Sequence, residues 1–156
     1  MRTIALALFL TACGGAAPAA EAPAKKTADA PVSAADRCLA DATAPRTPKS
    51  DAPEHITVAH ILVRHAGVKH AEATRSRGEA CLRAEQAREE LLGGADWDAV
   101  VKKYSDAGSA TGGALGSVSK SDLDPTFANA AFSLDVNELS HVVETDRGFH
   151  VIVRTE

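Results

Sequence analysis

Residues 55–64, HITVAHILVR, predict the strand from which the fold can be built. The run is rich in β-branched and aliphatic residues, which is typical of a strand. Apolar and polar residues do not alternate regularly at its centre, as they would if one face of the strand were solvated. We therefore expect the centre to be buried on both faces. The remaining elements are assigned outward from this strand.

Helices and short strands are predicted on its C-terminal side. Residues 77–92 have apolar residues at helical spacing and end at two glycines. Residues 97–104 have the same spacing behind Asp96, a typical N-cap. The other predicted elements are strands at 114–118, 139–143 and 149–154, a helical turn at 121–123 and a helix that begins at Pro125. Their order predicts an α+β domain with about four helices around a small antiparallel sheet.

Composition excludes several classes of protein. The chain has 156 residues, a formal net charge of -4 and only 4% aromatic residues. This length allows one ordinary domain and a tail. Its apolar runs are all shorter than the roughly 18 residues of a spanning helix, which excludes a polytopic membrane protein. The mild acidity and the lack of a basic block argue against nucleic acid as a partner.

Residues 14–53 differ from the rest of the chain. They include 14 alanines and six of the seven prolines, and they contain no aromatic residue. Such a segment buries too little apolar surface to offset the entropy of ordering it. We therefore predict a flexible tether at 13–53, with Asp36 to Leu39 as the one place where it could dock, and a folded domain at 54–156.

The first thirteen residues are typical of an export signal. A positive charge at Arg2 precedes a short apolar run and small residues, so residues 1–12 are predicted to be a signal peptide. The ending Leu10, Thr11, Ala12, Cys13 resembles the bacterial lipobox, which implies lipidation of Cys13. The alternative is a plain secretory signal. The lipobox implies a domain anchored by lipid to the cell envelope and facing the periplasm or the exterior, and Gly14 favours the outer membrane.

Cys38 and Cys81 are the other two cysteines. In an oxidising compartment a disulfide between them is expected. The alternative is a pair of free thiols, because a sequence does not give the distance between two Cα atoms. A disulfide here would join the tether to the first predicted helix.

Five short motifs, in order, resemble parvulin-type (PpiC, rotamase) peptidyl-prolyl cis-trans isomerases. They are HILVRH at 60–65, YSD at 104–106, GGALG at 112–116, the pair Phe127 and Phe132, and GFHVI at 148–152. The resemblance implies a parvulin-like fold of the FKBP-like type and isomerisation of X-Pro bonds in unfolded or exported proteins. It implies neither a cofactor nor a metal, and we expect a monomer.

The resemblance also implies a site. His60 and His150 match two neighbouring histidines beneath the substrate amide, and Thr145 matches a hydroxyl that supports them. The alternative is that both histidines only shape the core of the sheet. The implied proline pocket is formed by Leu115, Leu123 and Phe127, with Val118 on its wall. The implied cations beside it are Arg64, Lys69 and His70, which could attract an acidic residue or a phosphate before proline. The alternative is that these cations belong to a solvated loop without a binding role.

One residue departs from the family pattern. Ala107 stands where the family usually has cysteine or aspartate, which excludes a covalent mechanism through that position. Two functions therefore stay open. The chain is expected to be an isomerase that works by desolvation and by stabilising the twisted amide, or a parvulin domain of low or no activity that binds proline-containing segments as a chaperone.

Overall fold

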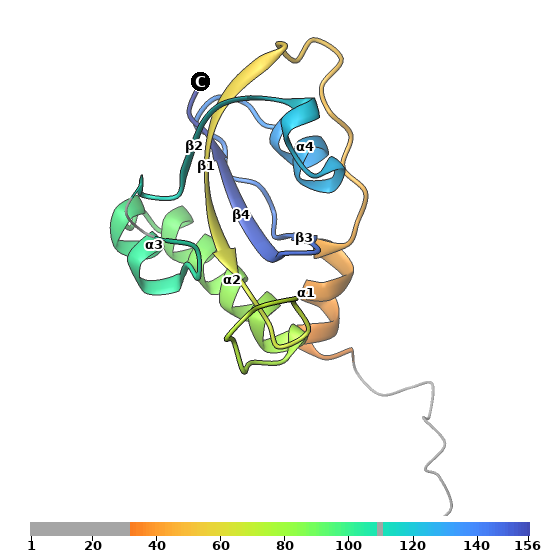
Figure 1. The fold of residues 1–156 in the computed structure, drawn as a ribbon, viewed down its shortest axis with the longest axis vertical. Coiled ribbons are helices and arrows are strands. Elements are labelled where there is room, and N and C mark those ends of the chain that lie inside the picture. The colour runs from red at the N-terminus through yellow and green to blue at the C-terminus, as the bar shows by residue number, and fades with distance from the viewer. Residues whose placement is uncertain (1–31, 109–110) are drawn as a thin grey trace, which may run out of the picture. The chain divides into compact units, whose positions relative to one another are not determined.

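Figure 1 shows the computed structural model, which describes residues 32–108 and 111–156. The predicted signal peptide, Cys13 and the first part of the predicted tether lie outside the described residues. The elements in chain order are α1 (Ala34–Ala42), β1 (His55–Val63), α2 (Arg77–Leu92), α3 (Trp97–Tyr104), β2 (Ala114–Ser119), the 3-10 turn η2 (Lys120–Asp122), α4 (Pro125–Ala131), β3 (Val143–Thr145) and β4 (Gly148–Arg154).

The four strands form one antiparallel sheet in the order β2-β1-β4-β3. The strand β1 is central and pairs with β2 on one side and β4 on the other. This architecture confirms the predicted α+β class. Among the described residues, no helix is both long and apolar enough to cross a bilayer.

The two faces of the sheet are covered by different helices (Figure 1). Ile61 and Val63 of β1 pack in a core with α1, α2 and α3. Ile56 and Val58 pack in a second core with α4. Because side chains alternate along a strand, the odd positions of β1 face the first core and the even positions face the second. His60, an even position, therefore lies on the α4 face.

The prediction of a flexible tether is wrong for residues 34–42, because they form the helix α1. Ser33 caps this helix by accepting a hydrogen bond from the backbone N–H of Asp36 at 3.0 Å. Cys38 and Ala42 are buried in the core that α1 shares with α2. The composition of the segment prevents it from folding alone, but a narrow stripe of small side chains is enough to pack against the alanines of α2. The chain after α1 is also held, since the N–H of Lys49 donates to the carbonyl of Phe132 at 3.1 Å.

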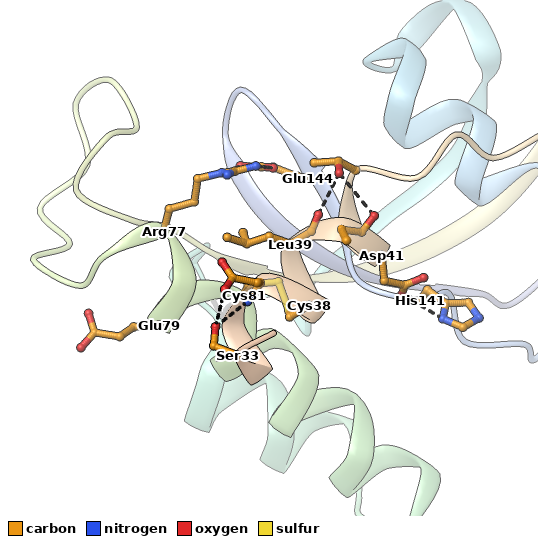
Figure 2. The surroundings of a disulfide bond; sticks show 12 residues. Ser33, Cys38, Leu39, Asp41, Arg77, Glu79, Cys81, His141 and Glu144 are labelled. Atoms are coloured by element: carbon orange, nitrogen blue, oxygen red, sulfur yellow. Dashed lines mark hydrogen bonds and ion pairs between the residues drawn. A yellow bond between two sulfur atoms is a disulfide. The ribbon is translucent and has the colours of Figure 1, made fainter. Parts of the chain in front are cut away.

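A disulfide between Cys38 and Cys81 joins α1 to α2, as Figure 2 shows. The two Cα atoms are 6.0 Å apart, within the usual range for a disulfide. Both cysteines are buried. The C-terminal end of α1 is fixed separately, because Asp41 accepts from Arg46 and contacts His141 at 3.1 Å. The helix α1 is therefore part of the folded body.

The strand predicted at 139–143 is also corrected. The regular strand β3 is Val143–Thr145, and Leu139 makes only an isolated bridge to Val153. Between them, the Ser140 hydroxyl accepts the backbone N–H of Ile152 at 2.9 Å. A side chain thus replaces the backbone acceptor, and the regular ladder is interrupted there.

Removal of the disulfide is predicted to destabilise the domain without changing the fold around β1. The bridge closes a segment with a sequence separation of 43, and the loss of that closure should cost about 4 kcal/mol of unfolding free energy. The measurement is urea unfolding of the oxidised protein and of the Cys38→Ser, Cys81→Ser variant. Reductant should shift the parent to the variant's midpoint and leave the variant unchanged. Equal midpoints for parent and variant would contradict the prediction.

Candidate functional site

A hollow of about 510 Å³ opens on the α4 face of the sheet. This volume is typical of pockets that bind small ligands or single side chains. The hollow is lined by residues from all four strands, from the loop after α3, and from the segments around η2, α4 and the β3–β4 turn. They are His60, Leu62, Arg64, Ala107, Leu115, Val118, Asp122, Leu123, Asp124, Phe127, Thr145, Asp146, Arg147 and His150.

The two predicted histidines meet in this hollow. In the pairing of β1 with β4, His60 lies opposite Ile152 and Leu62 lies opposite His150, so the imidazoles are diagonal neighbours on one face. Their Nδ1 atoms are 3.1 Å apart, and the rings are nearly parallel with centroids 5.3 Å apart. A hydrogen bond between two Nδ1 atoms requires one of them to be protonated and the other bare.

Thr145 extends this hydrogen-bonded pair to the next strand. Its hydroxyl lies 2.8 Å from Nε2 of His150 and also accepts the backbone N–H of Arg147 at 3.1 Å. Both nitrogens of His150 are thereby engaged. Among the described residues, Nε2 of His60 has no hydrogen-bond partner, so it is the nitrogen of the pair that remains available in the hollow.

Both imidazoles are held neutral. Burial, followed by the positive charge of Arg147, lowers the pKa of His60 from 6.5 to about 4. Burial is also the main cause for His150, where His60 and Arg147 add to it and the pKa is lowered to about 3. At neutral pH the pair therefore offers fixed hydrogen-bond dipoles and no charge.

Phe127 covers both histidines edge-on. Its ring centroid is 5.6 Å from that of His60 and 5.1 Å from that of His150, at angles of 77° and 88°. The position of Phe127 is set by the start of α4, where Asp124 accepts the N–H groups of Thr126 and Phe127 at 2.8 and 3.1 Å. Proline at the first position of α4 favours the same start.

The other predicted apolar residues also line the hollow. Val118 and Leu123 adjoin the core beneath α4, and Leu115 is exposed enough for a ligand to contact it. Together with Phe127 they form an apolar wall beside two neutral imidazoles. A wall of this kind suits a small apolar ring better than a charged group.

The three predicted cations, Arg64, Lys69 and His70, all line a second hollow beside the first, and of the three Arg64 alone also lines the first. The N–H of Arg64 donates to the Asp106 carboxylate at 2.8 Å and its guanidinium donates to the Asp106 carbonyl at 3.1 Å. The second, neighbouring hollow has a volume of about 720 Å³. The two hollows share Arg64, Thr145, Asp146 and Arg147.

Ala107 lines the hollow and supplies no polar side-chain atom. The preceding residues are used structurally, since Ser105 accepts from the N–H of Leu62 at 3.2 Å and Asp106 pairs with Arg75. No three His, Cys, Asp or Glu side chains in the described part of the chain are grouped to hold a metal ion. The hydrogen-bonded network of the site is formed by His60, His150 and Thr145, and the charged residues that also line the hollow are Arg64, Asp122, Asp124, Asp146 and Arg147.

A family model of the PPIC-type PPIase domain matches residues 46–156. The chain belongs to this family. The match includes every residue of the hollow and leaves out α1. The site residues expected from the resemblance, which run from His60 to His150, therefore lie within the matched domain.

Curated relatives of this PPIase domain come from several kinds of protein. It is 38% identical to the peptidyl-prolyl cis-trans isomerase Pin1 of Malus domestica, over 51% of this chain and 68% of that protein. It is 39% identical to the foldase protein PrsA of Bacillus subtilis, over 47% of this chain and 26% of that protein. The chaperone SurA of Chromobacterium violaceum is 39% identical over 50% of this chain and 18% of its own length.

Solved structures share the fold. The crystal structure of PrsA from Bacillus subtilis matches with a TM-score of 0.52 and 33% identity, covering 66% of this chain and 35% of that one. The isomerase ESS1 from Candida albicans matches with a TM-score of 0.60 and 27% identity, covering 70% of this chain and 66% of that one. The chain thus spans only part of the length of several relatives.

Sequence reasoning missed several residues that line the hollow of this PPIase domain, namely Leu62, Asp122, Asp124, Asp146 and Arg147, and Arg147 is the one that acts on the histidines. It lies in the turn between β3 and β4, lines both hollows and acts on the pKa of both histidines. Residues 145–148, TDRG, have the composition of a turn, but a turn sequence does not say where its side chains lie. The sequence signal that could have assigned Arg147 to the site is its position two residues after Thr145, which the resemblance already placed there.

The lowered pKa values predict a loss of stability in acid. Below about pH 6.5 the unfolded chain protonates both histidines, while the folded chain resists until about pH 4 for His60 and about pH 3 for His150. The free energy of unfolding should be constant above pH 6.5 and should fall on acidification, by up to about 1.4 kcal/mol per pH unit for each histidine. Urea unfolding between pH 7.5 and 4.5 measures it.

The matched variants for this test are His150→Gln and His55→Gln. His55 is an exposed histidine on the same sheet. The first variant should show a shallower dependence on pH than the parent, and the second should match the parent. If both variants kept the parent's slope, the buried pair would not be its source.

Proposed function

We propose that this chain is a peptidyl-prolyl cis-trans isomerase that assists the folding of exported proteins. The observation that carries the proposal is Phe127 lying edge-on over the hydrogen-bonded pair His60 and His150 in a hollow of about 510 Å³. The family assignment supports it. The site offers an apolar wall for a proline ring beside polar atoms for the adjoining amide.

The chemistry needs no charged group. An X-Pro bond isomerises slowly because rotation breaks amide resonance, at a barrier of about 18–20 kcal/mol. A catalyst must bind the twisted amide better than either planar form. An apolar hollow removes the water that stabilises the polar planar amide. Neutral imidazoles are compatible with that dry environment, whereas a charged imidazolium would retain water.

The hydrogen-bonded chain from Thr145 through His150 to His60 sets which atom His60 presents. If Thr145 donates to His150, then His150 donates to His60, and Nε2 of His60 has the hydrogen. If Thr145 accepts, the order reverses and Nε2 is bare. In both arrangements the hydrogen bonds hold the His60 ring in place, and Nε2 meets the amide as a donor in the first and as an acceptor in the second. We assign His60 to the amide, and His150 and Thr145 to holding its tautomer.

The neighbouring hollow supports a preference for an acidic residue before proline. Within the described residues, Arg64, Lys69 and Arg147 form no ion pair, and the Arg64 guanidinium donates to the backbone carbonyl of Asp106. Of the carboxylates in this hollow, Glu144 is paired with Arg77 and Asp146 faces the three cations. Lys69 and Arg147 can therefore neutralise a carboxylate that lies next to the proline hollow. Arg64 contributes positive charge to both hollows.

Ala107 favours a second candidate, a module that binds proline-containing segments and turns them over slowly or not at all. The position lines the hollow without adding a polar atom to the histidine network. Loss of one polar group from a preorganised site can cost about 100- to 1000-fold in rate. Binding would be less affected, because the apolar wall remains.

The cellular setting of this proposal is the bacterial envelope. The lipobox-like ending at Cys13 supports a lipid anchor, and residues 14–31 would supply the flexible part of the tether. Acyl chains on one cysteine hold a domain at a membrane by about 0.8 kcal/mol for each buried methylene group. A buried disulfide suits an oxidising compartment. We propose that the domain acts there as a monomer, with the outer membrane favoured.

The isomerase proposal predicts catalysis on an X-Pro peptide series in a protease-coupled assay. A rate above the uncatalysed one is expected, with peptides that have glutamate before proline faster than those that have lysine. Phe127→Ala should weaken prolyl-peptide binding by up to about 3 kcal/mol, because it removes the ring beside the substrate. Peptide affinity is measured separately by titration, and thermal unfolding shows that each variant is folded.

Phe127→Leu is the matched control for this series. It keeps apolar volume in the hollow and should retain most of the binding. Retained peptide binding with no rate above the uncatalysed one would replace the isomerase by the binding module. Unchanged affinity in Phe127→Ala would show that the proline binds elsewhere.

The anchor predicts that Cys13→Ala releases the protein from membranes. The parent expressed in a bacterium should fractionate with the envelope and gain the mass of a lipid on its N-terminal residue, whereas the variant should do neither. Cys38→Ser serves as the control for a cysteine without an anchoring role. Membrane fractionation and mass that were the same in parent and Cys13→Ala protein would refute the anchor.

A further inference from the structure

The spacing of two residues in the hollow conflicts with regular strand geometry. Leu115 and Val118 both belong to β2 and both line the hollow. They are three positions apart, and in a regular strand an odd spacing places two side chains on opposite faces of the sheet. Something in β2 must therefore reverse the alternation between them.

The pairing of β2 with β1 locates that reversal. Val118 lies opposite Ile56 and Gly116 lies opposite Val58, as in a regular ladder. The next pair joins Ala59 to Ala114, so the register shifts and Leu115 has no partner on β1. This is a β-bulge, in which two residues of one strand face one residue of the other. The extra residue turns Leu115 to the α4 face.

Gly116 is required for its backbone conformation and not for space. Its φ is +73°, in the left-handed region that side-chain-bearing residues rarely adopt. A Cβ atom built on Gly116 would meet nothing within 4 Å. A substitution there would strain the backbone without a collision, so its effect would be to oppose the bulge.

We propose that Gly116 is a positioning residue for proline binding, which acts by holding the bulge that turns Leu115 into the hollow. This inference rests on the proposed function, since it assigns how one wall of that same site is built. Gly116 lines no part of the hollow itself. Its effect on a substrate passes through Leu115, while the histidine network is formed by residues of β1, β3 and β4.

The test uses three glycine variants of the full chain. Gly116→Ala should raise KM for a prolyl peptide about tenfold and change kcat little, because the strain of a left-handed alanine favours the unbulged strand. Gly116→Asn should recover most of the affinity, because asparagine tolerates left-handed φ. Gly94→Ala is the matched control: Gly94 has φ +89°, a Cβ there would meet nothing within 4 Å, and it lies between α2 and α3.

A double-mutant cycle then isolates the route through Leu115. Leu115→Ala should weaken prolyl-peptide binding, and adding Gly116→Ala to it should have little further effect, because the displaced side chain is already gone. If Gly116→Ala weakened binding equally in the parent and in the Leu115→Ala variant, Leu115 would not be the route. Equal KM values for Gly116→Ala and Gly94→Ala would likewise overturn the inference.

A readout without substrate separates this inference from the proposed function. The Leu115 methyl resonances of the free protein should shift in Gly116→Ala, recover in Gly116→Asn and stay unchanged in Gly94→Ala. If these shifts occurred while no prolyl peptide bound the parent, the proposed function would fail and the bulge would stand. Unchanged methyl resonances in Gly116→Ala would overturn the role of Gly116, whatever the activity.

Discussion

The antiparallel pairing of β1 with β4 is the constraint on which the site depends. It places His60 and His150 on one face, while Ile61 and Val151 on the other face are locked in the core beneath α2 and α3. A shift by one residue would bury the imidazoles in that apolar core and expose its aliphatic residues. The same burial that fixes the register also removes water from the histidines. The register of the strands, the burial of the two imidazoles and their neutrality thus have one physical origin.

The parts of the fold that could be predicted have strong local signals. Residues 77–92 combine a helical apolar stripe with terminal glycines, and the helix has the bounds expected from them. Asp96 and Pro125 marked the starts of α3 and α4 by capping chemistry, which depends on neighbouring residues alone. The meeting of His60 with His150 could not be derived from spacing. It was expected only because five short motifs resemble a family.

The parts that failed depend on contacts between distant segments. The helix α1 has a composition typical of a linker, and its stability depends on packing against the alanines of α2, on the bridge to Cys81 and on contacts such as that of Asp41 with His141. Ser140 interrupts a strand because its hydroxyl meets an N–H twelve residues away. Arg147 belongs to a turn whose side-chain positions no local pattern predicts. The β-bulge before Gly116 is likewise defined by the pairing of β2 with β1, which the sequence of β2 alone does not give.

The covalent link between α1 and α2 also changes how the domain would respond to mechanical load. If the chain were pulled between Ser33 and its C-terminal strand, the covalent path would run through α1 and across the sulfur atoms into α2. Residues 39–80, which include β1, would lie outside that path. The central strand could then not be drawn out lengthwise while the disulfide is intact.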